Sequence, residues 1–232
     1  MNLVPGVDLQ LLAVRFVDNG HPDQQLGPRY RVWFRNNGPA NAAPFNVLLA
    51  ASNDPVPNNE MPQAGVVYDQ LEPGEIRSVD IRLPLAANQL VMTPEGKRTP
   101  FNYLHVLVNS HRDLPETDFT NNGSVLARTE VLPVDPAVFS SDQNAISSGA
   151  TFNVAGEGFG PEPGQAVLVV NGTQVPGEIQ GWYDLGVRIT VPPVALDSPM
   201  NAELLIVRGD GAASNPLELQ LAPGGLIGSP VP

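Results

Sequence analysis

The sequence contains no cysteine, and Lys97 is its single lysine. Without cysteine, disulfide bonds, thiolate metal sites and thiol nucleophiles are all excluded. Positive charge is scarce as well, because 12 Lys and Arg residues stand against 24 Asp and Glu, a net charge of −12. Residues 136–232 contain only Arg188 and Arg208 as cations. With no basic patch to neutralise phosphates, we predict that the chain binds neither nucleic acid nor anionic membrane surfaces.

Three further features are missing. No stretch approaches the length of a membrane span, roughly 18 apolar residues, so we expect no direct membrane insertion. The N-terminal stretch MNLVPGVDLQ has neither the basic region nor the long apolar region of a signal peptide. No G-x-S-x-G elbow or comparable nucleophile motif occurs. We therefore predict that the protein is not an enzyme.

Glycine and proline are plentiful instead, with 22 and 25 residues. No long window keeps a helical period free of them, whereas short segments alternate apolar and polar residues as half-buried strands do. In residues 28–36, one face consists of Tyr30, Val32 and Phe34, and the other of Arg29, Arg31, Trp33 and Arg35. The strands predicted in the front half are residues 7–16, 28–36, 45–52, 76–84, 101–110 and 124–132. This pattern predicts an all-β fold, most simply a β-sandwich.

The short proline-containing segment LPVDP, residues 132–136, divides the chain. Beyond it, the predicted strands are residues 151–156, 166–172, 186–192, 202–209 and 216–222. The sequence therefore predicts two domains in tandem, residues 1–133 and 134–223. Residues 224–232 lack periodicity and are expected to form an extended C-terminal tail.

Four motifs occur in a characteristic order in the front half. They are Asp8-Leu9, Asn36 to Gly38, Leu71 to Gly74, and Glu116 to Asn122. In this order, residues 6–132 resemble the CARDB family, bacterial cell-adhesion-related modules with an immunoglobulin-like sandwich. The family usually has an Asp just after its penultimate strand, where this chain has Asn109.

The back half resembles a different family. GATFNVAGEGFG, residues 149–160, is similar to the opening of an IPT/TIG domain, and Trp182, Val191-Pro192 and residues 211–215 follow in the order of that family. The resemblance covers about residues 136–222. IPT/TIG domains are also immunoglobulin-like. Together the two resemblances imply an all-β chain of two tandem immunoglobulin-like β-sandwiches.

Glycine-containing turns carry specific predictions. Pro73-Gly74 suits a type II turn, in which glycine takes a positive φ. Asn122-Gly123 is expected to supply positive φ for a tight hairpin, and Asn171-Gly172 is also expected to form an N-G turn.

The stretch GEGFG, residues 156–160, lacks the G-x-G-x-x-G spacing of a phosphate loop, and Pro161 follows where a helix would begin. We expect its glycines to form a positive-φ corner that places Phe159 in the core.

The acidic stretch HRDLPETDFTNNGS, residues 111–124, has two interpretations. Calcium prefers several oxygen ligands, and Glu116, Asp118 and Asn121 would be the first candidates, with Asp113 in reserve. The spacing is not that of an EF-hand, and no glycine lies in the middle of the loop. The alternative is a hairpin loop shaped by its Asn side chains. We expect the hairpin, and no cofactor.

The resemblances imply a non-catalytic structural or adhesion protein, which would act as a spacer or interaction module in an extracellular or cell-surface assembly. Its partners would be other proteins or further copies of itself, joined through edge strands that have unpaired N–H and C=O groups. One alternative is a decoration or structural protein on the surface of a virion or other particle. Another is a carbohydrate-binding module in which Trp33 or Trp182 stacks on a sugar.

Overall fold

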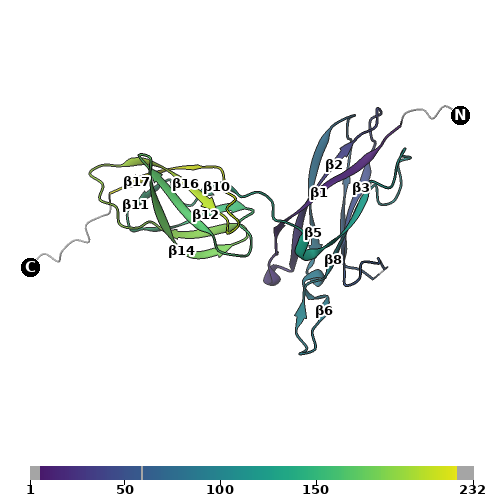
Figure 1. Cartoon of the computed structure of the whole chain (residues 1–232), viewed down its shortest axis with the longest axis horizontal. Coiled ribbons are helices and arrows are strands. Elements are labelled where there is room, and N and C mark those ends of the chain that lie inside the picture. The colour runs from purple at the N-terminus through teal and green to yellow at the C-terminus, as the bar shows by residue number, and fades with distance from the viewer. Residues whose placement is uncertain (1–5, 59, 224–232) are drawn as a thin grey trace, which may run out of the picture. The chain divides into compact units, whose positions relative to one another are not determined.

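The computed structural model describes residues 6–58 and 60–223, and its strands are traced in Figure 1. The predicted all-β fold is confirmed, since the described elements are strands and three short 3-10 helices. The chain divides into two compact units, Met1–Leu132 (unit 1) and Pro133–Pro232 (unit 2). The tail predicted at residues 224–232 lies outside the described residues. Among the described residues, no helix has the length and apolar character needed to cross a bilayer.

Unit 1 contains two main antiparallel sheets. The first has the order β1 (Leu9–Asp18), β2 (Leu26–Asn36), β5 (Ile76–Pro84). The second has the order β4 (Gln63–Tyr68), β3 (Phe45–Ser52), β8 (Tyr103–Val108), β9 (Gly123–Ala127). The connections contain the short pair β6 (Val91–Met92) and β7 (Arg98–Thr99) and the 3-10 helices η1 (Pro22–Gln24), η2 (Leu85–Gln89) and η3 (Arg128–Glu130).

Both sheets of unit 1 contribute to one hydrophobic core. The alternation predicted for β2 is confirmed, because Tyr30, Val32 and Phe34 are buried while the intervening residues face outward. Phe34 meets Phe45 of β3 edge to face, with ring centroids 5.5 Å apart. This contact joins the inner faces of the two sheets, and edge-to-face geometry adds to the stabilisation from apolar burial.

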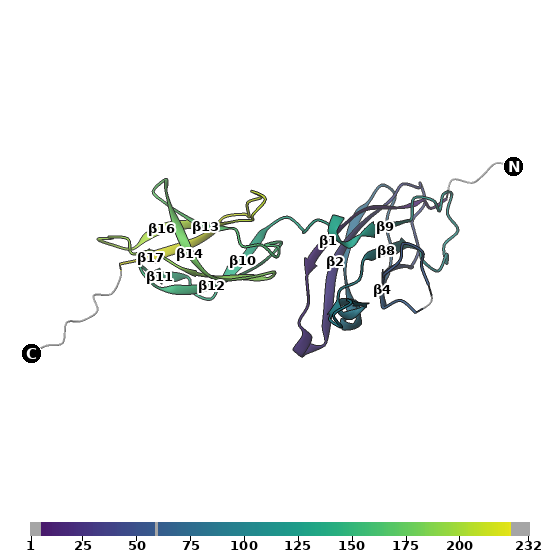
Figure 2. The same ribbon diagram turned by 60° about the horizontal axis from the view of Figure 1, so that its bottom comes forward.

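Unit 2 is built on one curled sheet of eight strands. Its order is β10 (Ala137–Ser141), β12 (Thr151–Glu157), β15 (Gly186–Thr190), β14 (Thr173–Tyr183), β13 (Gln165–Val170), β16 (Met200–Val207), β17 (Leu217–Ala222), β11 (Ala145–Ser147). The first half of β14 pairs with β13 and its second half with β15. A strand shared in this way lets the sheet fold over, and Figure 2 shows β10 and β12 on one side of the unit and β13 and β16 on the other. Buried residues of both parts form a single core.

The turn predictions have mixed outcomes. Gly74 has φ +76° and lies in a turn closed by a 3.1 Å hydrogen bond from the Glu75 N–H to the Glu72 carbonyl, as predicted. Asn171 and Gly172 both have positive φ, at 50° and 76°, and join β13 to β14.

The corner predicted at GEGFG is also confirmed. Gly158 and Gly160 each have φ +73°, and Phe159 between them is fully buried.

The prediction of positive φ at Asn122-Gly123 is wrong. In the 109–122 connection the residues with left-handed φ are Asn109, at 51°, and Arg112, at 56°. Gly123 is the first residue of β9 and pairs directly with Leu107 of β8. The reason for a glycine at this position is space, because a Cβ there would lie 2.7 Å from Leu107 Cδ2 and 2.9 Å from the Val106 carbonyl oxygen.

Candidate functional site

The acidic loop connects β8 to β9 and is held to the start of β1 by Glu116. One Glu116 oxygen accepts the backbone N–H of Leu9 at 2.5 Å. The other accepts the side-chain amides of Asn109 at 2.6 Å and Asn122 at 2.5 Å. We call this group of Glu116, Asn109 and Asn122 the Glu116 clasp. It joins two segments of unit 1 that are 107 residues apart in sequence.

Burial raises the pKa of the Glu116 carboxyl, and the nearby Asp8 carboxylate acts in the same direction. The three donated hydrogen bonds favour the charged form and oppose this shift. Since the net pKa shift is upward, desolvation outweighs the hydrogen bonds. Glu116 is therefore a partly desolvated acceptor at the centre of the loop.

The other two calcium candidates have separate partners. Asp118 is exposed and accepts both the backbone N–H and the hydroxyl of Thr120, each at 2.7 Å. Asn121 donates its amide to Asp8 Oδ1 at 3.0 Å. Within residues 6–58 and 60–223, no three His, Asp or Glu side chains gather closely enough to hold a metal ion. Glu116 is surrounded by N–H donors, and this arrangement suits a structural acceptor.

A mainly apolar groove of about 460 Å³ lies on the outer face of the β4-β3-β8-β9 sheet. Its lining includes Leu48, Leu107 and Val125 of the sheet and Met61 and Phe119 of the flanking loops. Leu48 pairs directly with Leu107 across β3 and β8. Leu107, Val125 and Phe119 all remain exposed. An apolar strip with loops on both sides is typical of an interaction surface.

His105 forms part of the same groove but is only 5% exposed. It lies on the outer face of β8, between Ala50 of β3 and Val125 of β9. Its Nε2 is 3.3 Å from the Asp54 carbonyl oxygen in the loop after β3. The imidazole is thus covered by that loop and connects it to the sheet.

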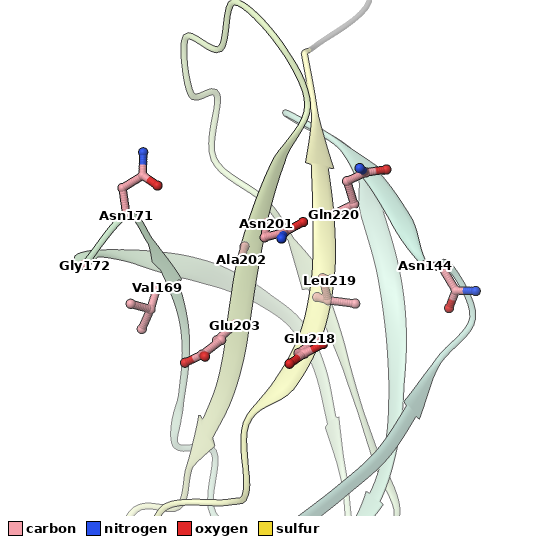
Figure 3. A pocket seen from close by; sticks show the side chains of 10 residues that line it. All are labelled: Asn144, Val169, Asn171, Gly172, Asn201, Ala202, Glu203, Glu218, Leu219 and Gln220. Carbon is pink, nitrogen blue, oxygen red and sulfur yellow. The ribbon is translucent and has the colours of Figure 1, made fainter.

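Unit 2 has a polar basin of about 610 Å³ over β13, β16 and β17. Glu203 and Glu218 stand directly opposite each other on β16 and β17, and Figure 3 shows their carboxylates side by side. The basin's amide side chains belong to Asn144, Asn171, Asn201 and Gln220. Among the described residues, neither Glu203 nor Glu218 has an ion-pair or hydrogen-bond partner for its carboxylate. Like charges placed opposite each other across strands are destabilising unless something compensates them.

Unit 1 has the opposite electrostatic character on the outer face of its β1-β2-β5 sheet. The strand register assembles Arg15, Arg29, Arg31, Arg35 and Arg82 there, with Asp18 and Asp80 among them. We call this surface the arginine face. Alternation already places Arg29, Arg31 and Arg35 on one face of β2, and the strand register adds Arg15 of β1 and Arg82 of β5. The absence of a basic patch inferred from the sequence is therefore wrong for this face.

The two tryptophans are in different environments. Trp33 lies half-buried on the arginine face, with the Arg31 guanidinium 6.0 Å from its ring centroid. Trp182 packs on the buried Phe159, with centroids 5.9 Å apart, and donates its indole N–H to the Gly160 carbonyl at 2.9 Å. Trp182 therefore has a packing role inside unit 2, whereas Trp33 is partly exposed on the arginine face, with Arg31 over its ring.

No protein-family model matches the chain, and no curated protein matches it. Among solved structures, the chain is similar to the gamma-CGTase from alkalophilic Bacillus clarkii, with 16% identity, a TM-score of 0.34 and coverage of 94% of this chain and 26% of that one. It is also similar to the beta-D-glucoside glucohydrolase from Trichoderma reesei, with 12% identity, a TM-score of 0.33 and coverage of 52% and 19%. The chain thus spans about a quarter or less of the length of these two enzymes. At such TM-scores the likeness carries no argument about fold or function.

Proposed function

We propose that the chain is a non-catalytic interaction and spacer protein made of two immunoglobulin-like sandwiches, the first CARDB-like and the second IPT/TIG-like. Within each unit, strands on opposite sides of a single core support the sandwich assignment. The motif orders of the two halves support the family assignments. We further propose that the protein acts in an extracellular or cell-surface assembly.

The observation that carries this function is the apolar groove of unit 1. Leu107 is 42% exposed on a central strand of a sheet, and it lines the groove together with Met61 and Phe119 of the flanking loops. An extended peptide lying along β8 and β9 would bury this strip, and its alternate side chains would fill the groove. We propose such a segment of a partner protein as the ligand.

The experiment selects, from a library of displayed extended peptides, those that bind the full chain. The affinities of the selected peptides are then measured. Sequences with apolar residues at alternate positions should be enriched, and Leu107→Asp should weaken their binding by about tenfold or more, because it places a charge in the apolar strip.

The matched control is Leu12→Asp. Leu12 is equally exposed, at 41%, but lies on β1 outside the groove. Equal loss of binding in both variants, or selected peptides that bind Leu107→Asp unchanged, would contradict the proposal.

A further inference from the structure

The arginine face has more positive charge than its own aspartates compensate. Asp18 pairs with Arg29 and Arg82, at 2.7 Å in each case. Asp80 pairs with Arg31, at 2.6 Å. Arg15 and Arg35 have no acidic partner among the described residues. Two guanidinium groups on this face are therefore free to bind an anion.

These two arginines lie on either side of an aromatic anchor. Arg35 is two residues from Trp33 on β2, and Arg15 pairs directly with Arg31 on the other side of it. Arginine and tryptophan are the residue types that most often dominate the binding energy of protein interfaces. The guanidinium group also matches a carboxylate in a bidentate geometry. The face is thus suited to an acidic protein surface.

The complementary surface is present in the same chain. The basin of unit 2 places Glu203 and Glu218 side by side, and four amide side chains that can also accept N–H donors line the same basin (Figure 3). Unit 2 has few cations of its own. The Arg208 guanidinium is engaged by Asp210 and by the carbonyls of Val134 and Gly158. Arg188 is on β15, in the other part of the curled sheet.

We propose that the arginine face of one copy binds the acidic basin of a second copy. Arg15 and Arg35 would pair with Glu203 and Glu218, and the basin, at about 610 Å³, has room for guanidinium groups. The two patches are different surfaces of one chain, so the contact is heterologous: the copy that uses its arginine face keeps its basin free, and the copy that uses its basin keeps its arginine face free. Such a contact propagates as an open head-to-tail chain unless its geometry closes a ring. This interaction does not depend on the apolar groove.

Sedimentation velocity of the full chain tests the proposal. The average mass should rise with protein concentration at low salt and fall back toward the monomer at about 0.5 M salt, because salt screens interactions between exposed charges. Either charge reversal, Arg15→Glu with Arg35→Glu or Glu203→Arg with Glu218→Arg, should weaken association by about tenfold or more. Mixing the two double variants should restore it, since the mixture again contains opposite charges at both surfaces.

The control pair, Lys97→Glu with Arg98→Glu, changes the net charge by the same amount as Arg15→Glu with Arg35→Glu. Its two residues are exposed in the β6-β7 hairpin of unit 1, and this variant should associate like the wild type. Circular dichroism melts check that each variant folds, and Arg15→Gln with Arg35→Gln provides a milder second test. The proposal is overturned by a wild-type protein that stays monomeric at every concentration and salt, or by a mixture that fails to associate. A monomer whose arginine face binds polygalacturonate would also overturn it, by identifying an acidic polysaccharide as the ligand.

Discussion

The Glu116 carboxylate has several hydrogen-bond donors, but it is partly removed from water, which is unfavourable for its charged form. It accepts three N–H donors, yet burial raises its pKa above the ordinary value. A raised carboxyl pKa means that the folded state binds the proton more tightly than the unfolded state does. The stability linked to this proton is fully present below the unfolded pKa and is lost as pH rises through the folded value.

This sign gives a prediction for Glu116→Gln, which removes the titration. The free energy of unfolding of the wild type minus that of the variant should decrease between pH of about 4 and about 7. Urea denaturation at several pH values measures the difference. Glu72→Gln, which removes an exposed carboxylate from the same unit, is the control. If this difference in the free energy of unfolding grew with pH, the hydrogen bonds to Glu116 would outweigh burial in setting its pKa, and the prediction would be wrong.

Gly123 gives a second prediction at the scale of the residue. Gly123→Ala should destabilise unit 1 by about 1–3 kcal/mol, because the new methyl would press on Leu107 and on the Val106 carbonyl. Gly209→Ala is the control, since nothing lies closer than 3.8 Å to a Cβ built there. Thermal melts compare the two variants. If Gly123→Ala were as stable as Gly209→Ala, β8 and β9 would be able to move apart without a cost in free energy, and the prediction would be wrong.

At the scale of the element, Asp18 joins the ends of three strands. Its side chain is only 4% exposed and meets Arg29 of β2 and Arg82 of β5, whose side chains keep about a quarter of their surface exposed, 27% and 26%. Asp18→Asn should therefore lower the free energy of unfolding by about 2 kcal/mol, less than for a fully buried ion pair because solvent screens the arginines. Asp80→Asn, at a site 30% exposed, should cost clearly less in the same denaturant titration. The reverse order would contradict this account.

The elements also show what sequence patterns can and cannot predict. β2, which alternates, and β3, which contains a continuous apolar run, were predicted within two residues of their observed ends. β14 was missed because Pro176, Gly177 and Gly181 read as breakers. In the structure Gly177 packs against Ile189, where a Cβ would lie 2.7 Å from its Cγ2, and a register shift near Gly181 lets β14 pass from one neighbour to the other. β4 was missed because half of its residues are exposed and a proline-rich loop precedes it.

The candidate surfaces were harder to predict than the strands. Glu116 could be recognised as a loop carboxylate, but its partners Leu9 and Asn109 depend on pairings made only in three dimensions. The signal available in the sequence was Asn109, a polar residue at the end of an apolar strand, and the structure shows that it is buried. The arginine face was predictable only in part, because alternation places Arg29 and Arg31 on one face of β2, whereas Arg82 meets Arg29 only through the register of β2 and β5.

At the scale of the whole molecule, each unit has its own hydrophobic core. We therefore predict two unfolding transitions in calorimetry. Leu49→Ala in unit 1 and Leu204→Ala in unit 2 each remove a fully buried side chain and should each cost about 2–5 kcal/mol. Each variant should shift one transition and leave the other in place. A single transition that moves in both variants would show that the units unfold as one.

The pairing of β11 with β17 has a mechanical consequence. β11 is the second strand of unit 2 and β17 is the last strand among its described residues, and the two run parallel, with Ala145 opposite Gln220 and Ser147 opposite Ala222. The chain enters the unit through β10, which pairs with β12, so tension on the ends of the unit reaches β11 once β10 has given way. That tension would pull β11 and β17 in opposite directions along their length. Their hydrogen bonds would then be sheared together rather than opened one after another. Single-molecule stretching should find that unit 2 yields at a lower force when Ser148→Pro removes the bond from the Ser148 N–H to the Ala222 carbonyl. A short parallel contact would thus help unit 2 to resist stretching.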